Sequence, residues 1–421
     1  MITLVQALNY RCLRYVRRPL GPFHVLVGRN ATGKTTFLDV IGFLGRFVSD
    51  GLDAAVEERS ATFQDLVWGR SGSRFELAVE ADIPSVLRQS PANPRGTSRV
   101  RVRYEVAIQI DSASNERQVA AETLTMENAD DADPVERTLF PDTIVPPATI
   151  LRGRLRRAGK QIVVNKVTGG NDNFTPETES DEGKRWAPSF RLGPRKSALG
   201  NLPDDETKFP VATWFRGLLA RGVEPIVLNS LLIRRPSPPG KGAGFRADGS
   251  NLPWVVDALR SDPARFRQWI DHVRTALPEI ADIRTVERPE DRHRYLVLHH
   301  ANGMEIPSWL ASDGTLRLLA LTLPAYLAAA DKIYLIEEPE NGIHPTAVET
   351  VFKSLSNVYD AQVLMATHSP VILGIAEPEQ ILCFARTAEG ATDVVRGKEH
   401  PALQEWRGEM DLGTLFAAGV L

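Results

Sequence analysis

A short apolar stretch followed by a glycine-bounded loop constrains the fold of this chain more than any other feature. Residues 24–27 are typical of a buried strand, residues 28–33 form the loop, and an apolar pattern with helical spacing begins at Phe37. Gly28 is followed by four residues and then by Gly33-Lys34-Thr35, which is the complete phosphate-binding loop pattern. A chance match in an ordinary glycine turn is the weaker interpretation, because the required strand and helix flank the loop.

The chemistry of phosphate binding explains why these residue types stand at this spacing. Glycines let the backbone turn tightly enough to point several N–H groups at one anion, and the start of the next helix adds a partial positive charge. We expect Lys34 to reach the β- and γ-phosphates of ATP, and the Thr35 hydroxyl to bind Mg²⁺. The predicted nucleotide-binding residues of the loop are Asn30, Ala31, Thr32, Gly33, Lys34, Thr35 and Thr36.

Composition limits the class of protein. The length of 421 residues predicts two or three domain-sized units, or one domain with a large insertion. The net charge of −3 gives no overall attraction to nucleic acid. Only two cysteines are present, which excludes a disulfide framework and a cysteine zinc site. The first residues lack the layout of a signal peptide and no apolar run is long enough to span a bilayer, so we expect a cytoplasmic protein without a membrane partner.

Alternating and polar stretches divide the remaining chain. Strands are predicted at 2–8 and 23–27, and alternation with period two predicts two more at 75–81 and 100–108. Residues 111–210 are polar, carry charge runs of both signs and lack a heptad repeat. We expect small irregular β structure with loops, interrupted by short strand-like pieces such as 161–167. Later elements are predicted as a helix at 211–219, a strand at 225–233, helices at 251–260 and 263–277, and strands at 280–287 and 295–299. The predicted organisation is an N-terminal lobe with the phosphate loop (1–70), a β- and loop-rich insertion (71–250) and a C-terminal lobe (251–421).

A second apolar strand ends in two acids. Residues 333–336 are apolar and are followed by Glu337 and Glu338, as expected for a strand buried in a parallel sheet. Ligands of open α/β sheets bind where such strands end. We expect Glu337 to hold Mg²⁺ and Glu338 to orient or deprotonate the attacking water. The alternative is a strand that ends in two solvated acids, and the phosphate loop elsewhere in the chain argues against it.

Two further stretches carry polar residues at the ends of predicted elements. Ser312 opens an apolar helix at 316–327 and is a good N-cap residue, while the same helix start is also suited to an anion. A third apolar strand is predicted to begin at Ala361 and to end at His368. We expect His368 to contact the γ-phosphate, although an isolated histidine after a strand is more often structural.

Taken in order, these four stretches resemble the ABC-type ATPase heads of the SMC/RecF/OLD group. They are GRNATGKTT at 28–36, ASDGTLR at 311–317, IYLIEEPENGIHP at 333–345 and ATHS at 366–369. The resemblance implies an α/β P-loop NTPase fold of the ABC/SMC type, with a mixed β and loop-rich insertion between the phosphate loop and the signature stretch. It also implies ATP and Mg²⁺ as ligands and ATP hydrolysis as the activity.

The resemblance implies a role for each matching residue. Two heads of such proteins sandwich two ATP molecules, so each signature stretch acts in trans on the nucleotide of the partner head. By this resemblance Glu338 is the catalytic acid and His368 the switch histidine. Arg11 matches an arginine that approaches the nucleotide, and Gln64 is the candidate for a metal-binding glutamine. The signature residues that would act in trans are Ser312, Asp313 and Gly314.

The chain departs from the family pattern in three places. Glu337 stands where most members carry aspartate, and Asp313 stands where a second glycine is usual; both variants resemble the OLD-type subgroup. OLD nucleases carry a Toprim nuclease domain after the switch histidine, for which the short stretch after His368 has no room. We therefore expect a separately encoded effector partner, a nuclease or toxin of a bacterial antiphage module. A cluster formed by Asp130, Asp131 and Asp133 is a weak alternative metal site.

Two other functions are weighed against this one. A RecF-like DNA-repair clamp would bind DNA phosphates through clustered arginines, although solvated loops are the simpler interpretation of those clusters. The nucleotide-binding subunit of a membrane transporter is less well supported, because the long stretch between Lys34 and Glu337 is unlike the compact layout of such subunits. The arginines of the clamp hypothesis are Arg14, Arg17, Arg18, Arg152, Arg154, Arg156 and Arg157.

Overall fold

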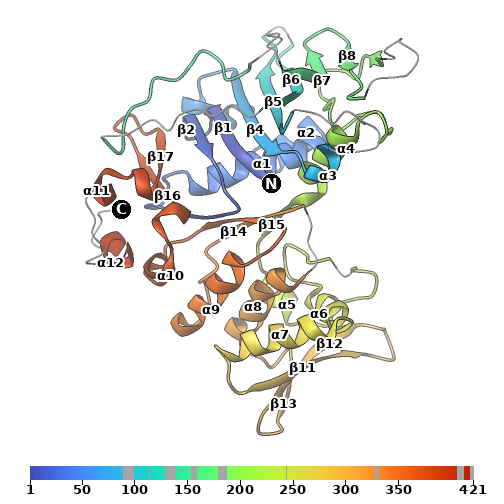
Figure 1. Cartoon of the computed structure of the whole chain (residues 1–421), viewed down its shortest axis with the longest axis vertical. Helices are drawn as coiled ribbons and strands as arrows, with labels where there is room; N and C mark the ends of the chain where they lie inside the picture. The colour runs from blue at the N-terminus through green and yellow to red at the C-terminus, as the bar shows by residue number, and fades with distance from the viewer. Residues whose placement is uncertain are drawn as a thin grey trace. The chain divides into compact units, whose positions relative to one another are not determined.

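The computed structural model divides the chain into two compact units (Figure 1). Unit 1 contains Met1–Gly21, Gly28–Val223 and Leu382–Gln404, and unit 2 contains Pro22–Val27, Glu224–Ile381 and Glu405–Leu421. The structure describes residues 1–88, 99–112, 114–128, 139–152, 159–178, 187–242, 244–327, 331–404 and 412–417.

Unit 1 is built on an eight-stranded sheet in which every neighbouring pair is antiparallel. Polar and apolar side chains alternate along β4 and β5, and the interior residues of both strands are buried on both faces of the sheet. The strand order is β2-β1-β4-β5-β6-β7-β8-β9. The strands are β1 (Ile2–Tyr10), β2 (Leu13–Pro19), β4 (Arg74–Asp82), β5 (Arg101–Ile110), β6 (Arg117–Glu127), β7 (Gln161–Val167), β8 (Asp172–Phe174) and β9 (Ser189–Phe190).

The helix α1 (Lys34–Asp50) follows the phosphate loop and is buried along most of its length. Tyr10 of β1, Phe43 of α1 and Phe75 of β4 have ring centroids 5.1–5.9 Å apart, so α1 packs on the sheet through aromatic contacts.

Other elements of unit 1 are α2 (Leu52–Glu57), η1 (Phe63–Leu66), η2 (Trp68–Arg70), α3 (Ser85–Arg88), α4 (Pro210–Gly217), the π-helix η3 (Leu218–Gly222), the hairpin of β16 (Ile381–Arg386) and β17 (Thr392–Arg396), η6 (Gly397–Glu399) and α11 (Pro401–Gln404).

Unit 2 contains a sheet of the opposite kind. Strand β14 (Lys332–Glu337) pairs in parallel with β15 (Ala361–Ala366), which pairs in parallel with β3 (Phe23–Val27). The strand order is β10-β14-β15-β3, with β10 (Val223–Ile226) beside β14. The interior residues of β3, β14 and β15 are buried, as in parallel sheets covered by helices on both faces. Helix α8 (Asp313–Thr322) precedes β14 in the chain, α9 (Pro345–Ser356) follows β14, and α10 (Pro370–Ile375) follows β15.

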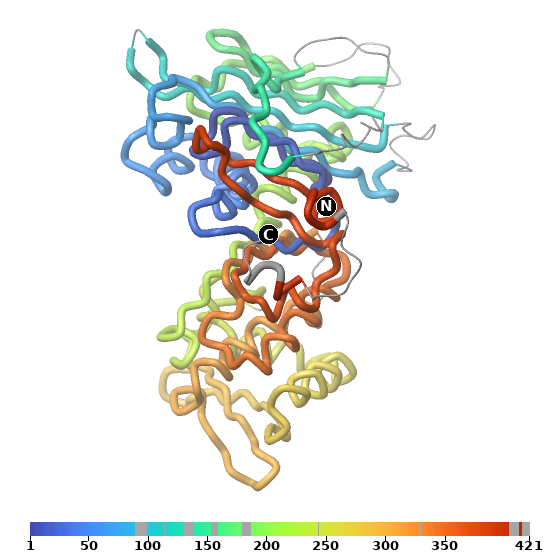
Figure 2. Tube along the Cα trace, turned by 90° about the vertical axis from the view of Figure 1, so that its left-hand side faces the viewer, coloured from blue at the N-terminus to red at the C-terminus, as the bar shows by residue number. Residues whose placement is uncertain are grey.

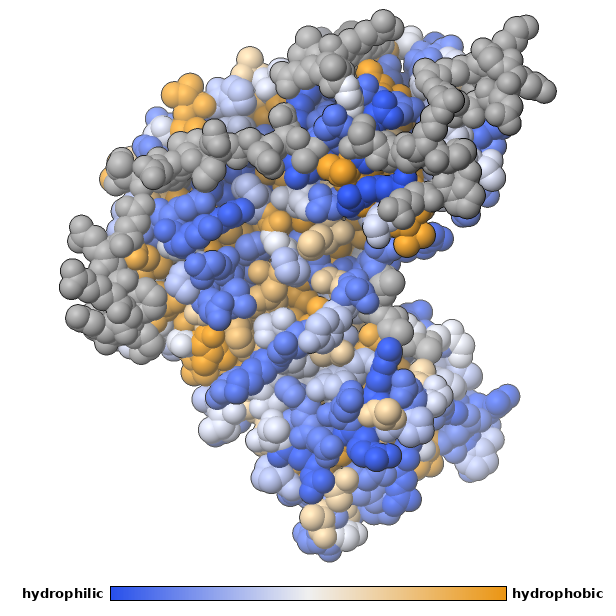
Figure 3. Space-filling view, viewed as in Figure 1, coloured by the Kyte–Doolittle hydropathy of each residue, from blue (hydrophilic) through white to orange (hydrophobic). Residues whose placement is uncertain are grey.

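The remaining part of unit 2 is a three-stranded antiparallel sheet with two helices against it. Its strands are β11 (Ile280–Glu287), β12 (Arg294–His300) and β13 (Glu305–Pro307), and the β12–β13 hairpin extends away from the rest of this unit (Figure 2). The helices are α6 (Leu252–Arg260) and α7 (Pro263–Arg274), and the face that carries α7 is mostly hydrophilic (Figure 3). Short helices α5 (Ser230–Ile233), η4 (Leu323–Tyr326), η5 (Pro378–Gln380) and α12 (Leu412–Ala417) complete the unit.

Most of the predicted elements are confirmed, and three differ. The strand predicted at 225–233 ends at Ile226 and is followed by helix α5, whose start is capped by the Asn229 side chain. The basic stretch at 13–19 is the edge strand β2 rather than a loop. Within 111–210, where small irregular β structure was predicted, β6 is a long regular strand paired with β5, whereas the strand-like piece predicted at 161–167 is confirmed as β7. In the described ranges, no helix combines the length and apolar character that crossing a bilayer requires.

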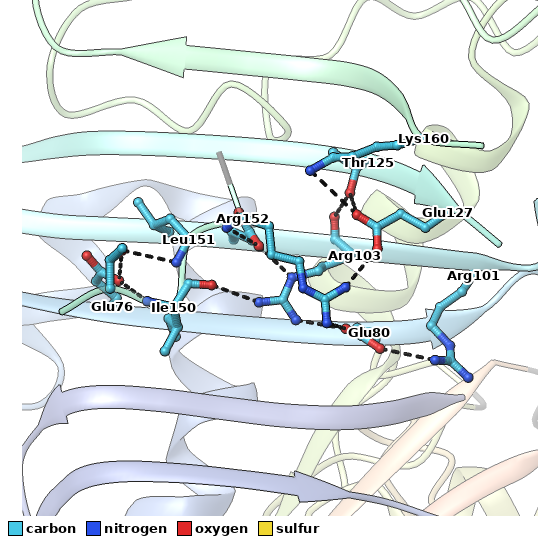
Figure 4. Close-up of polar contacts among 12 residues, drawn as sticks. Glu76, Glu80, Arg101, Arg103, Thr125, Glu127, Ile150, Leu151, Arg152 and Lys160 are labelled. Atoms are coloured by element: carbon cyan, nitrogen blue, oxygen red, sulfur yellow. Dashed lines mark hydrogen bonds and ion pairs between the residues drawn. The ribbon is translucent and has the colours of Figure 1, made fainter. Parts of the chain in front are cut away.

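A buried network of charges joins the polar residues of β4 and β5 to the segment 149–152 (Figure 4). Arg103 of β5 is 1% exposed, and its guanidinium donates to Glu105 at 2.5 Å, to Glu80 at 2.7 Å and to the carbonyl of Ile150 at 3.0 Å. Glu76 in turn accepts from the backbone N–H of Ile150 at 2.8 Å. Charged side chains therefore fill the sheet face in pairs and hold the segment 149–152 across it.

Replacing Arg103 by methionine should reduce the free energy of unfolding by about 3–5 kcal/mol, because buried carboxylates would lose their cation. The measurement is urea denaturation of the full chain followed by tryptophan fluorescence. The control is Arg46→Met, which breaks an exposed pair with Asp50 on α1 and should change stability by less than about 1 kcal/mol. Equal small effects of both variants would show that the network does not stabilise unit 1.

Candidate functional site

The phosphate loop leaves β3 at Gly28 and enters α1 at Lys34, and its backbone is left-handed at three positions. The φ angles are 145° at Gly28, 61° at Ala31 and 103° at Gly33. A positive φ is uncommon at a residue other than glycine, so Ala31 marks a conformation that the surrounding structure imposes. Successive turns of this kind gather backbone N–H groups into a concave anion-binding surface.

The side chains of the loop supply the groups that a phosphate chain with Mg²⁺ requires. Lys34 is 7% exposed, and its ammonium donates to the carbonyls of Gly28 at 2.7 Å and Arg29 at 3.1 Å, which hold it over the loop. Thr32 is buried and donates its hydroxyl to the Arg29 carbonyl at 2.8 Å. The residues Asn30, Ala31 and Thr35 are exposed and Thr36 is half-buried. An ammonium, exposed hydroxyls and a helix start fit phosphate and Mg²⁺ together.

Arg11 lies in the turn between β1 and β2, and its own φ is positive at 51°. Its guanidinium forms an ion pair with Asp39 of α1 at 3.3 Å. Asp39 also accepts from the Tyr10 hydroxyl at 2.5 Å and from Arg59 at 2.7 Å. This cluster fixes Arg11 to the same helix that begins in the phosphate loop. Gln64, the metal-ligand candidate, lies partly buried in η1 of the same unit.

The two predicted acids and the predicted switch histidine lie at or just after the ends of strands at one edge of the unit 2 sheet. Ala366 of β15 pairs with Leu26 of β3 on one side and with Glu337 of β14 on the other. The ladder continues for one residue, because Glu338 N–H donates to the Ala366 carbonyl at 2.8 Å and Thr367 N–H to the Leu26 carbonyl at 3.1 Å. The parallel register therefore places the ends of all three strands at the same level.

Glu338 has a backbone conformation and a partner that fix its carboxylate. Its φ is 47°, a left-handed value that clusters at functional sites in residues other than glycine. The side-chain amide of Asn341 donates to its carboxylate, and the Asn341 N–H donates to its carbonyl at 3.0 Å. Both Glu337 and Glu338 are exposed, so the structure places the two predicted acids at an accessible sheet edge.

Glu340 connects the loops after β14 and β15. Its Oε1 accepts from the Thr367 hydroxyl at 2.6 Å and from the His368 N–H at 2.9 Å. Sequence reasoning gave no role to Glu340 or Asn341, which were assigned to a turn. The only signal was their position as polar residues directly after a strand that ends in acids, and neither hydrogen-bond partner could be read from the sequence.

The signature stretch begins α8, as predicted, and Ser312 is its N-cap. The Ser312 hydroxyl is exposed and accepts from the Thr315 N–H at 3.1 Å. A Cβ on Gly314 would stand 2.7 Å from the carbonyl oxygen of Gly342, so the helix start packs directly on the turn that follows the acids. Glycine at position 314 is therefore required by a close backbone approach.

Asp313 is an ion-paired residue in the same helix turn. Its carboxylate accepts from Arg317 Nε at 3.0 Å and lies 4.0 Å from Arg234. Burial alone would raise the pKa of Asp313, but hydrogen bonds from Ser230 and Arg317 and the charges of Arg317 and Arg234 outweigh it and lower that pKa. Asp313 is therefore ionised at neutral pH, and its charge is already matched within its own unit.

The structure describes four arginines of the clamp hypothesis, and three of these four are paired with carboxylates. Arg14 forms an ion pair with Glu389, Arg18 with Glu399 at 3.3 Å, and Arg152 with Glu127 at 2.8 Å. Such pairs leave less positive charge for DNA phosphates. Across the described ranges, no group of three or more His, Cys, Asp and Glu side chains could hold a metal ion. The residues Arg154, Arg156, Arg157, Asp130, Asp131 and Asp133 lie outside the described residues.

Solved structures show the fold of this chain. The crystal structure of an SMC head bound to the C-terminal winged-helix domain of ScpA matches with a TM-score of 0.52 and 13% identity, over 94% of this chain and 97% of that one. An SMC head from Pyrococcus furiosus with an extended coiled coil, bound to the C-terminal domain of ScpA, matches with a TM-score of 0.48 and 12% identity, over 94% and 95%. The SMC head domain from Thermotoga maritima matches with a TM-score of 0.43 and 10% identity, over 94% and 98%.

A family model identifies the sequence relatives. The model described as "AAA domain, putative AbiEii toxin, Type IV TA system" matches residues 23–144 and 170–374, which is more than half of the chain. Among curated proteins, none matches this sequence. The predicted ABC/SMC-type P-loop fold is confirmed, while the OLD-like subgroup stays a prediction. The chain belongs to this AbiEii-type AAA family and has the fold of an SMC-type ATPase head.

Proposed function

We propose that this protein is an ATPase that hydrolyses ATP to ADP and phosphate. The observation that carries the proposal is the register of β3, β15 and β14. It aligns the strand that leads into the phosphate loop with the strand that ends in Glu337 and Glu338. Ligands of such sheets bind outside the carboxyl ends of the strands, and the residues that follow these three strands are those that phosphoryl transfer requires.

Each residue has a distinct task in this proposal. Lys34 and the N–H groups of the phosphate loop bind the phosphates, with Arg11 beside the nucleotide. Thr35, Glu337 and Gln64 hold Mg²⁺, which when bound neutralises charge on the β- and γ-phosphate oxygens. Glu338, oriented by Asn341, accepts a proton as the water oxygen bonds to the γ-phosphorus and the bond to the ADP oxygen breaks. His368 contacts the γ-phosphate.

We further propose that two copies of the chain associate when ATP is bound. Ser312 is exposed at the start of α8, and a helix start with an exposed hydroxyl is suited to a phosphate. In the SMC-type heads that this chain resembles, this stretch acts on the nucleotide of the partner head. The motif resemblance and the exposure of Ser312 support the same arrangement here, with Ser312, Asp313 and Gly314 facing the second copy.

The ATP-dependent state would control a separately encoded effector, a nuclease or toxin of a bacterial antiphage module. The family description, which names a putative AbiEii toxin of a type IV toxin–antitoxin system, supports a role of this kind. The SMC head that matches best among the three structures described above was solved with a bound domain of ScpA, so a head of this fold can bind a separate protein. Pairing of Arg14, Arg18 and Arg152 with carboxylates disfavours the DNA clamp.

Replacing Lys34 by alanine should abolish ATP binding, because the phosphates lose the one cation that the loop itself fixes over them. The measurement is isothermal titration calorimetry with Mg-ATP. The control is Lys353→Ala on α9, which removes a lysine paired with Glu349 and should leave the affinity unchanged. Affinity of the Lys34→Ala protein within threefold of the parent would contradict the assignment of the phosphate loop.

Replacing Glu338 by glutamine should leave ATP binding intact and slow hydrolysis by about 10²–10⁴-fold, the usual contribution of a general base. Because the ATP-bound state would then persist, light scattering should show a change from monomer to dimer when Mg-ATP is added. Glu349→Gln on α9 serves as the control. If Glu338→Gln hydrolyses ATP within a few-fold of the parent rate, another residue activates the attacking water. If its molar mass is the same with and without Mg-ATP, ATP-driven dimerisation is contradicted.

Ser312→Ala protein and Lys34→Ala protein should each be inactive, yet a mixture of the two should regain hydrolysis. A mixed dimer would combine the intact loop of one chain with the intact signature of the other. Random pairing in a two-fold symmetric dimer predicts up to about one quarter of the parent rate. Phosphate release is the measurement. A mixture as inactive as its components would contradict the trans role of Ser312.

A further inference from the structure

The hairpin of β16 and β17 supports the phosphate loop from a distant part of the sequence. Thr392 is the first residue of β17 and is 3% exposed. Its hydroxyl donates to the carbonyl of Thr32 at 2.8 Å, and its own N–H donates to the carbonyl of Cys12 at 3.0 Å. All three residues belong to unit 1. Thr392 therefore joins the phosphate loop, through its side chain, to the turn that follows β1, through its backbone.

Gly33, the next residue of the phosphate loop, packs directly against the Thr392 side chain. A Cβ on Gly33 would stand 2.4 Å from Thr392 Oγ1 and 3.0 Å from Cys12 Sγ. Gly33 also has a φ of 103°, so both its conformation and the space around it exclude a larger residue. Thr392 thus contacts two consecutive loop residues, one by a hydrogen bond and the other by close packing.

The hydrogen bond from Thr392 to the Thr32 carbonyl also determines the direction in which the Gly33 N–H points. The Thr32 carbonyl and the Gly33 N–H belong to one planar trans peptide unit, so they point in opposite directions and rotate together. Thr392 holds the carbonyl toward β17. The Gly33 N–H must then point away from β17, and it cannot rotate without breaking that bond. Thr32 is 4% exposed, so a carbonyl released in this way would lack a partner and would favour a rotated peptide.

We propose that Thr392 is a positioning residue for nucleotide binding, which fixes the Gly33 N–H in the direction that a nucleotide phosphate requires. This inference rests on the proposed function, since it concerns the loop that would bind ATP. Thr392 lies outside residues 23–144 and 170–374 that match the family model. The contact is therefore a feature of this chain that the family match does not assign.

The test compares three variants of Thr392 with a matched control in the same hairpin. Thr392→Val and Thr392→Ala remove the hydroxyl, and Thr392→Ser retains it. The control is Thr387→Val. Thr387 is 8% exposed and its hydroxyl accepts from the Ala391 N–H at 3.2 Å, so this variant also loses a hydrogen bond of a nearly buried threonine, but one that does not involve the phosphate loop.

The affinity for Mg-ATP is measured by calorimetry in the Glu338→Gln background, where hydrolysis does not interfere. Thr392→Val and Thr392→Ala should each bind ATP about three- to tenfold more weakly, the factor that one lost hydrogen bond gives. Thr392→Ser and Thr387→Val should remain within twofold of the parent. Without nucleotide, the midpoint temperature of thermal unfolding should fall by similar amounts for Thr387→Val and Thr392→Val. A difference in ATP affinity between these two variants then cannot be explained by stability alone.

Steady-state kinetics of the same variants with Glu338 present provide a second readout. The hydrogen bond holds the loop in the ground state and the transition state alike, so its loss should raise KM while kcat stays within twofold. Unchanged ATP affinity in both Thr392→Val and Thr392→Ala, or an equal loss in Thr387→Val, would overturn the inference. A parent protein that does not bind ATP at all would instead overturn the proposed function.

Discussion

The parallel register of β3, β15 and β14 is the constraint on which the candidate site of unit 2 depends. Backbone hydrogen bonds place Leu26, Ala366 and Glu337 at one level, so the loops after these strands begin at the same edge. A shift of one residue would turn every side chain of a strand to the other face. The N–H of Glu338 stays bonded to Ala366 although the chain already turns there, which accounts for the left-handed φ of 47° at Glu338.

The sequence predicted this part of the molecule well because its signals are local. Phe23–Val27 is a strand with the predicted bounds, the strand that begins at Ala361 ends at Ala366, two residues before the predicted end at His368, and the third strand differs from its prediction by one residue at each end. All three are buried on both faces and therefore appear as continuous apolar runs. The N-cap role of Ser312 was also predicted, because a capping side chain bonds to its own helix three residues later. The acids Glu337 and Glu338 were found because they stand where such a run ends.

The residues that sequence reasoning missed act through partners far along the chain. Glu340 bonds to Thr367 and His368, and Thr392 bonds to Thr32 across 360 positions; no local pattern marks either contact. The long regular strand β6, within 111–210, was missed for a related reason. Its Glu122 is fully buried and accepts hydrogen bonds from the hydroxyls of Tyr104 and Ser197, partners that the sequence does not reveal.

The packing around the phosphate loop and around the signature stretch requires a glycine in each motif. Gly33 stands where a side chain would collide with Thr392, and Gly314 stands where one would collide with the carbonyl of Gly342. A substitution at Gly314 would displace the backbone at Gly342, and one at Gly33 would displace the Thr392 side chain. Gly314 ties the start of α8 to the turn after the acids, so the helix start that would meet a second copy is fixed to the loop that would hold the attacking water. A change at the nucleotide could then reach the signature stretch through one direct contact within unit 2.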